Sequence, residues 1–327
     1  MRLVEKFKIG SPTAMVAGIL LFITAPLVLS NWIIFVLAIA LAKGMVVLGV
    51  VLLLRGGLIS FGHGLYSAAG AYAVAFALHR WNIREALFLI PLCLLAGSGM
   101  AALTGLLLKR YRGIFFAMLS LAFSMILYTV LFKFYKVTGG TDGMSIQSVK
   151  ILGFQPATES IRLSHYYLTL ILMIIVLYLG RRFIASPLGY MMQAVRYNEI
   201  RVEYMGTSVG RAIYFSYVFS GALGGLGGGL VALTVGHVAP ELAYWTASAD
   251  FVFVAVLGGA GNVFAPFLGS IVFEFVKNYA FKFSPHTWQM TLGGILLLII
   301  FFLPQGVWSL NETIQKKVMQ WRLSLKP

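Results

Sequence analysis

The side chains that could act on a solute lie mainly where glycines interrupt long apolar runs. The first such break is Arg55-Gly56-Gly57-Leu58-Ile59-Ser60-Phe61-Gly62-His63-Gly64, and the second is Gly258-Gly259-Ala260-Gly261-Asn262. Glycine lets the backbone leave the helix, which at membrane depth is tolerated only inside protein or beside a water-filled path. The first break could therefore line a path for a polar solute, and a tight turn between two helices explains it equally well.

Three ionisable residues, Lys43, Asp250 and Glu274, fall at membrane depth within apolar runs. Charges at that depth usually face the interior of a helix bundle and pair with each other. We therefore expect Lys43 to pair with one of the two acids. A proton relay is the functional alternative and would indicate an ion-coupled secondary transporter, although a relay generally needs more intramembrane carboxylates.

A third polar group, Thr138-Gly139-Gly140-Thr141-Asp142-Gly143, has the composition of a turn and could also gate the mouth of a path. Five residues are our candidates for a translocation pathway: Ser60, His63, Asp142, Asp250 and Asn262. The sequence shows no catalytic constellation and no spacing of residues typical of a metal site. The chain has one cysteine, Cys93, which we expect to be a small packing residue.

Composition determines the class of protein. The chain has 327 residues, of which 60% are hydrophobic and 11% charged, and its mean hydropathy is +0.89. Repeated apolar runs of this length predict a polytopic, all-α membrane protein with one transmembrane domain over residues 1–327. The net charge of +15 comes from residues between the apolar runs, so it does not indicate a nucleic-acid partner.

The apolar runs predict about 8–10 transmembrane helices. The candidate spans are 13–30, 32–54, 58–78, 86–108, 113–135, 166–184, 208–235, 247–258, 262–280 and 288–305. The seventh span is long and the eighth is short, which favours a broken or re-entrant segment there. The two glycine breaks, one in each half, suggest a diverged internal repeat. Gly221, Gly225 and Gly229 recur four residues apart, a spacing typical of close helix packing.

Lysine and arginine are twice as frequent on one side of the predicted membrane as on the other. By the positive-inside rule, this bias predicts that both termini and a basic tail at about 306–327 are cytoplasmic. The loop at about 136–165 then faces outward. We expect the first apolar run to be an uncleaved span rather than a signal peptide.

A polar, charged stretch at residues 181–206 is the longest cytoplasmic interruption. Ser186 followed by Pro187 predicts a helix N-terminus, and the apolar spacing after it predicts a short surface helix. Such a helix could be an ordinary loop element or a docking site for a cytoplasmic partner. The sequence contains no G-x-x-x-x-G-K-[ST] loop, so any ATP that drives this protein must bind another chain.

Taken together and in order, several motifs give the chain a family resemblance. They are Gly57-Leu-Ile-Ser-Phe-Gly-His-Gly, Tyr111-Arg-Gly-Ile-Phe-Phe-Ala-Met-Leu-Ser-Leu-Ala, Thr138-Gly-Gly-Thr-Asp-Gly, Ser186-Pro-Leu-Gly with Ala194-Val-Arg-Tyr-Asn-Glu-Ile, Val256-Leu-Gly-Gly-Ala-Gly-Asn and Pro304-Gln-Gly-Val. With this set the chain resembles the LivM-type permease subunits of ATP-binding-cassette (ABC) importers for branched-chain amino acids.

The resemblance implies a transport subunit that is not itself an enzyme, in a bacterial or archaeal plasma (inner) membrane. Its implied partners are ABC ATPase subunits, a second, LivH-like permease and an extracytoplasmic solute-binding protein. ATP and Mg²⁺ would bind the ATPases, and this chain would bind no cofactor. Related permeases import urea, amides or aromatic acids, which stay open as alternatives. The loop at about 185–207 would couple to the ATPase through Pro187, Gly189, Ala194, Arg196, Glu199 and Gly206.

Overall fold

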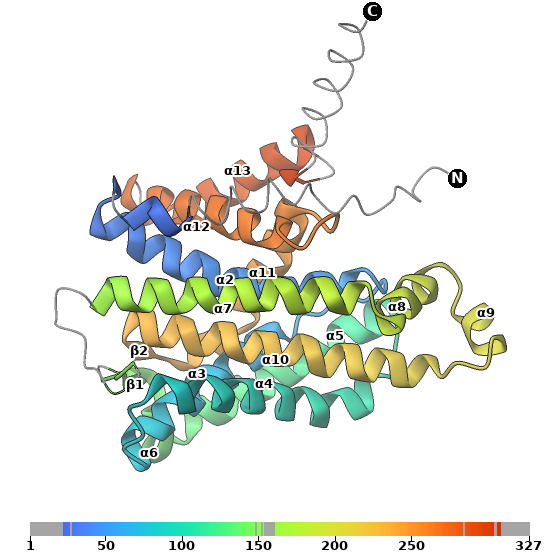
Figure 1. The fold of residues 1–327 in the computed structure, drawn as a ribbon, viewed down its shortest axis with the longest axis horizontal. Coiled ribbons are helices and arrows are strands. Elements are labelled where there is room, and N and C mark those ends of the chain that lie inside the picture. The colour runs from blue at the N-terminus through green and yellow to red at the C-terminus, as the bar shows by residue number, and fades with distance from the viewer. Residues whose placement is uncertain are drawn as a thin grey trace, which may run out of the picture.

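The computed structural model describes residues 22–26, 28–147, 149–151, 153, 161–283, 285–303 and 306–308, and every structural statement below concerns these residues. The fold is all-α apart from one pair of two-residue strands (Figure 1). The elements are α2 (Asn31–Leu54), α3 (His63–Arg80), α4 (Ala86–Leu108), α5 (Gly113–Lys133), α6 (Tyr135–Thr138), η1 (Gly140–Asp142), β1 (Met144–Ser145), α7 (Ile161–Ile184), α8 (Pro187–Tyr197), α9 (Glu199–Tyr204), α10 (Val209–Val235), β2 (His237–Val238), η2 (Pro240–Ala243), α11 (Trp245–Gly258), α12 (Ala265–Phe283) and α13 (Trp288–Phe302).

Five described helices, α2, α4, α5, α7 and α10, are long and apolar enough to cross a membrane. Helices α3 and α12 have 18 and 19 residues, so each is about 27 Å long, close to the thickness of a bilayer core. Helices α11 and α13 are shorter and apolar. The prediction of an all-α, polytopic membrane protein is therefore confirmed.

Several predicted boundaries need correction. The span predicted at 58–78 begins at His63, because the glycines before it form a turn. The span predicted at 166–184 begins at Ile161, since its first turn carries Arg162 and His165 and has too little hydropathy to be recognised. The span predicted at 262–280 is shifted to 265–283. Most of the predicted first span and of the basic tail lies outside the described residues.

Helix α10 is the centre of the packing and contacts α2, α3 and α4. It is continuous over 27 residues, so the predicted break does not fall within it, and the short α11 follows only after β2 and η2. Its glycines lie against other backbones: a Cβ on Gly97 or Gly225 would overlap the other residue's backbone, and a Cβ on Gly70 would overlap Gly225. The predicted role of these glycines in close helix packing is thus confirmed.

The two ends of the molecule carry different segments (Figure 1). At one end, β1 pairs with β2 in antiparallel register, with Met144 opposite Val238, and this pairing ties the 136–165 loop to the end of α10. Helices α8 and α9 lie at the other end. The segments predicted to face opposite sides of the membrane therefore lie at opposite ends of the helix bundle.

Candidate functional site

The coupling segment, residues 185–207, begins with the predicted capped helix. Ser186 Oγ accepts a hydrogen bond from the Gly189 backbone N–H at 3.3 Å, and Pro187 is the first residue of α8. A Cβ on Gly189 would lie too close to the carbonyl oxygens of Phe183 and Ile184, so glycine permits the tight turn between α7 and α8. The prediction of a helix N-terminus at Ser186 is confirmed.

The stretch holds two surface helices rather than one. Helix α8 ends at Tyr197, and Asn198 starts α9 by accepting a hydrogen bond from the Arg201 backbone N–H through its Oδ1 at 2.9 Å. Gly206 follows α9 with a φ of +79°, a left-handed conformation that favours glycine. The signal for α9 was available in the sequence, since asparagine is a preferred N-cap and a glutamate follows it.

One face of the coupling segment packs against the turn between α2 and α3. Met192 and Val195 of α8 are buried in a cluster with Leu53 and Leu58. A Cβ on Gly56 would overlap the Met192 side chain, so the first glycine break provides room for the coupling segment. Gly57, with a φ of +76°, lies beside the Arg196 side chain.

The opposite face of the coupling segment is exposed and rich in large apolar and aromatic side chains. The exposed residues include Ala194 and Arg196 on α8, and the large ones are Tyr190, Tyr197, Ile200, Tyr204 and Met205. Aromatic and methionine side chains are enriched at protein–protein interfaces. This face therefore has the composition of a docking surface.

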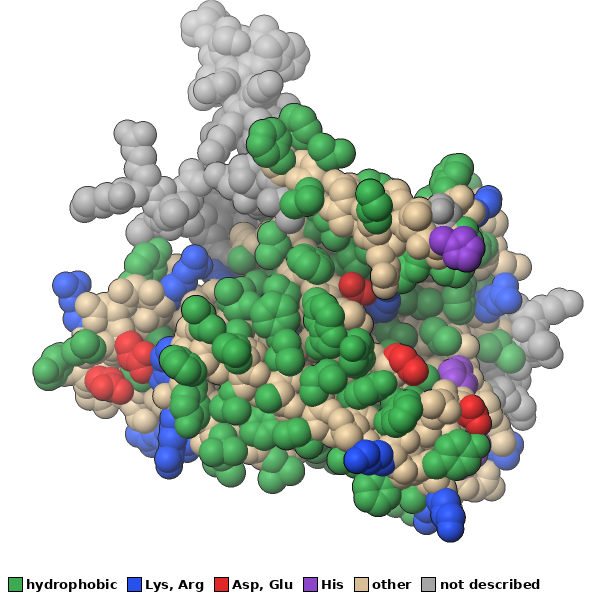
Figure 2. All heavy atoms as spheres, turned by 180° about the vertical axis from the view of Figure 1, so that it is seen from behind, with side chains coloured by type: hydrophobic (Ala, Val, Ile, Leu, Met, Phe, Trp, Pro, Cys, Tyr) green, Lys and Arg blue, Asp and Glu red, His purple; other side chains and the backbone are tan. Residues whose placement is uncertain are grey.

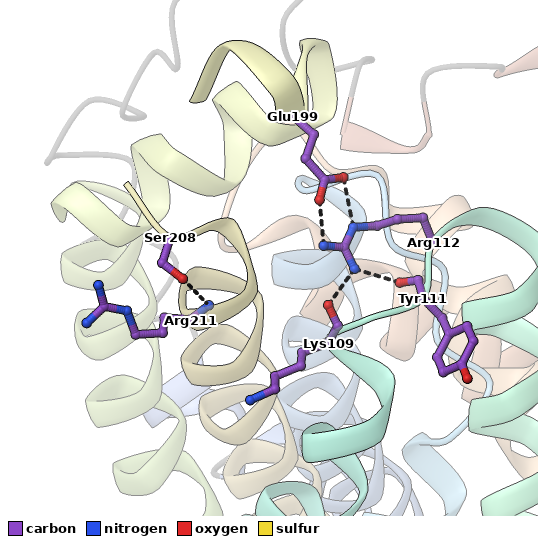
Figure 3. A network of polar contacts seen from close by, with 6 residues as sticks. All are labelled: Lys109, Tyr111, Arg112, Glu199, Ser208 and Arg211. Carbon is purple, nitrogen blue, oxygen red and sulfur yellow. Dashed lines mark hydrogen bonds and ion pairs between the residues drawn. The ribbon is translucent and has the colours of Figure 1, made fainter. Parts of the chain in front are cut away.

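A bidentate ion pair joins the coupling segment to the connection between α4 and α5 (Figure 3). Arg112 donates from Nη2 to Glu199 Oε1 at 2.7 Å and from Nε to Glu199 Oε2 at 2.9 Å. Its Nη1 also donates to the backbone carbonyls of Lys109 at 2.7 Å and Tyr111 at 2.8 Å. Arg112 thus links the end of α4, the start of α5 and the start of α9 through one guanidinium group.

The surroundings of the coupling segment are positively charged. Arg55, which follows α2, is largely buried, and this burial together with the nearby Arg196 lowers its pKa to about 10, so the side chain remains charged at neutral pH. Lys109 Nζ lies 5.5 Å from the centre of the Tyr214 ring. Glu199 is therefore an acid set among several bases, which favours its pairing with Arg112.

Two of the five path candidates lie together in the interior of the helix bundle. Ser60 and His63 are fully buried, and His63 Nε2 lies 2.7 Å from Ser220 Oγ of α10. Ser60 Oγ accepts a hydrogen bond from the Gly62 backbone N–H at 3.3 Å. In this conformation both side chains belong to a polar cluster between α3 and α10.

Asp142 and Asn262 lie apart from that cluster. Asp142 is exposed in η1, and the hydroxyl of Tyr135 donates to its Oδ2 at 2.8 Å. Asn262 is buried, and its Oδ1 accepts from the Phe264 backbone N–H at 3.2 Å, just before α12. In the described residues, the hydrogen bonds of Asp142 and Asn262 are to neighbours in the chain, Tyr135 and Phe264.

The ionisable residues at membrane depth are paired. Lys43 Nζ lies 2.6 Å from Glu274 Oε1, which confirms the expected pairing of Lys43 with an acid. Asp250 lies 2.9 Å from Lys277 Nζ, a partner that the sequence did not indicate. Among the described residues there is no group of three histidine, cysteine or acidic side chains that could hold a metal ion. Cys93 is buried against Gly229, as expected of a packing residue.

Comparison with known proteins determines the family. Residues 32–301, which include α2 to α12 and the coupling segment, match the family model described as branched-chain amino acid transport system / permease component. The chain belongs to this permease family. The match covers the helices between the motifs as well as the motifs themselves, except Pro304-Gln-Gly-Val, which lies after it.

Two permeases of the same description are similar to the chain over 77% of its length. The high-affinity branched-chain amino acid transport system permease protein LivM of Salmonella typhimurium is 28% identical over 274 residues, and that of Escherichia coli is 29% identical over 278 residues. The chain spans 64% of the length of each of these relatives. No solved structure matches the chain.

Sequence reasoning on this permease missed Arg112 and Lys277 as site residues. Both pair with acids that the sequence had singled out, but Arg112 is 87 residues from Glu199 and Lys277 is 27 residues from Asp250. Periodicity and motif spacing report only on local structure, so they carry no signal for contacts of this kind.

Proposed function

We propose that this permease is one half of the membrane channel of an ABC importer for branched-chain or other apolar amino acids. Separate ATPase subunits would dock on the coupling segment, and a second permease of the same family would complete the channel. Family membership and the exposed, aromatic face of the coupling segment support this proposal.

The single observation that carries the mechanism is the ion pair between Arg112 and Glu199. When ATP binding closes the ATPase dimer, the coupling segment moves with it. Glu199 then displaces the α4–α5 connection through Arg112, while Met192 displaces the α2–α3 turn on which it is seated. The coupling segment also leads directly into α10, the central helix, so three parts of the bundle receive the same movement.

The proposal also assigns the two ends of the bundle. The end with α8 and α9, together with both termini, faces the cytoplasm of a cell bounded by this inner membrane. The end with β1 and β2 faces outward, where a solute-binding protein delivers the solute. Among the path candidates, Asp142 and Asp250 are charged and accessible in this conformation, whereas Ser60, His63 and Asn262 would reach the solute only after a rearrangement.

Reconstitution tests this function. The chain is purified with its candidate ATPases and second permease, placed in liposomes with ATP inside, and supplied with the solute-binding protein and radiolabelled leucine outside. We expect uptake that requires both ATP and the binding protein. The proposal fails if the purified chain alone drives uptake under a proton or sodium gradient, or if no ATPase co-purifies with it from detergent.

A further inference from the structure

After the exposed Trp245 at its start, helix α11 presents one stripe of side chains outside the bundle. The stripe consists of Thr246, Asp250, Phe253 and Val256, at spacings of four, three and three residues, and the residues on the other sides of the helix are mostly buried. This spacing places all four side chains on one helical face. The face thus combines a carboxylate near the start of the helix with two apolar side chains one and two turns further along.

Lys277 of α12 brings a cation to the same face. Its Nζ lies 2.9 Å from Asp250 Oδ2, and it also lies 5.3 Å from the centre of the Trp288 ring. The side chains of Lys277 and Asp250 remain 29% and 31% exposed in the isolated chain. Figure 2 shows the rear face covered mainly by hydrophobic side chains, with a hollow below the layer of α12 and α13 and with acidic and basic side chains at its edge.

The second ion pair provides an internal comparison. Glu274 lies one turn before Lys277 on α12, and its side chain is only 6% exposed where it meets Lys43. The Lys43 side chain is 24% exposed, and the pair joins α2 to α12. Lys277 is six residues, about 9 Å, from the end of α12, and both members of its pair are open to the surface, with 31% of the Asp250 side chain exposed against 6% for Glu274. Charges open to hydrocarbon are costly, so this surface faces water or protein rather than lipid.

We propose that Lys277 and Asp250 form a binding station for a zwitterionic amino acid on the path between this permease and its partner. Lys277 binds the carboxylate of the solute, Asp250 binds its ammonium group, and Phe253 and Val256 contact its aliphatic side chain. The solute replaces each charge's present partner, so neither charge is left unpaired during binding. This assignment rests on the proposed function, because it names where that importer holds its solute.

Cysteine labelling tests the station, because the chain has a single native cysteine. In a Cys93→Ala background, cysteine replaces Phe253, Val256 or Lys277, and the assembled importer is treated with the membrane-impermeant anionic reagent 2-sulfonatoethyl methanethiosulfonate. Leu297→Cys on α13 is the matched control, since Leu297 is more exposed but lies on an apolar surface. We expect the station cysteines to react at least tenfold faster than the control, and leucine with the binding protein to slow the reaction.

The charge of Lys277 is tested in the same samples. The Lys277→Cys importer should transport leucine poorly, and modification with a 2-aminoethyl group should restore uptake several-fold, whereas a 2-sulfonatoethyl group should not. The complex with the Cys93→Ala permease, treated with each reagent, controls for modification of cysteines in the other subunits.

Each negative result has a distinct meaning. If the importer transports leucine but the station cysteines react as slowly as Leu297→Cys, the path does not follow this face and the station is wrong, although the proposed function stands. If both modified forms transport equally, the charge of Lys277 has no role and the station is also wrong. If the parent complex transports no leucine, the proposed function fails instead.

Discussion

Replacing Glu199 with glutamine should uncouple ATP hydrolysis from transport. The carboxylate accepts two charge-assisted hydrogen bonds from Arg112, at 2.7 and 2.9 Å, and the two side chains are 33% and 30% exposed. Fully exposed ion pairs contribute about 0.2–1 kcal/mol, and hydrogen bonds to charged groups about 1.5–3 kcal/mol. A bidentate pair that is one-third exposed should lie between them, at about 1.4 kcal/mol, which corresponds to roughly a tenfold change in a rate or equilibrium.

We therefore expect Glu199→Gln to lower leucine uptake per ATP hydrolysed about tenfold in proteoliposomes, with the basal ATPase rate retained. Arg112→Gln should cost more, because it also removes the bonds to the Lys109 and Tyr111 carbonyls. The exchange Arg112→Glu with Glu199→Arg should recover the part of the coupling that depends on the ion pair, but not the part that depends on the bonds to the two carbonyls. Glu203→Gln is the matched control, since Glu203 lies on the same helix and is exposed. Equal losses in Glu199→Gln and Glu203→Gln, or strictly additive effects in the double variant, would refute the reasoning.

Three further substitutions test the packing that supports this mechanism. Glu274→Ala should leave Lys43 without its partner at membrane depth and destabilise the chain by about 3–5 kcal/mol, as measured by thermal unfolding in detergent. Replacing both Lys43 and Glu274 with methionine should recover part of that loss. Gly225→Val should destabilise the chain by about 1–3 kcal/mol or more in the same assay, because the new side chain would overlap α4. Gly210→Ala on the same helix is the control. It has open space around it and should be neutral or slightly stabilising. Met192→Ala should weaken the packing of α8 against the α2–α3 turn by about 2–5 kcal/mol. Less ATPase should then co-purify with the chain. Unchanged co-purification would contradict the proposed docking.

The sequence predicted those features that depend on local pattern. Apolar runs located the spans, and Ser186 with Pro187 located the start of α8, because a cap and a first-turn proline act within one turn of helix. Charge at membrane depth predicted that Lys43 would be paired, since an unpaired charge there is costly. It did not indicate which acid would be the partner, because that choice depends on how α2 and α12 pack.

The parts of the site that could not be predicted are those set by tertiary contacts. Arg112 appeared only as one of several basic residues beside α5, and nothing in its neighbourhood indicates that Glu199 lies opposite. From the sequence, Gly56 and Gly57 were equally compatible with a solute path and with a turn. In the structure they form a turn, and Met192 of the coupling segment packs against Gly56. The diverged internal repeat and the cytoplasmic position of the termini stay predictions.

The glycine contacts between α10 and its neighbours have a mechanical consequence. Backbones touch without intervening side chains where Gly70 and Gly97 meet Gly225, so α3, α4 and α10 are closely packed, and we expect them to tilt together as one unit. Helix α10 has 27 residues and is therefore about 40 Å long. A tilt of about 5° at the end next to α9 would shift its far end, beside β2, by roughly 3.5 Å. In the proposed importer, ATP binding on the cytoplasmic side would in this way move the mouth on the other side without bending any helix.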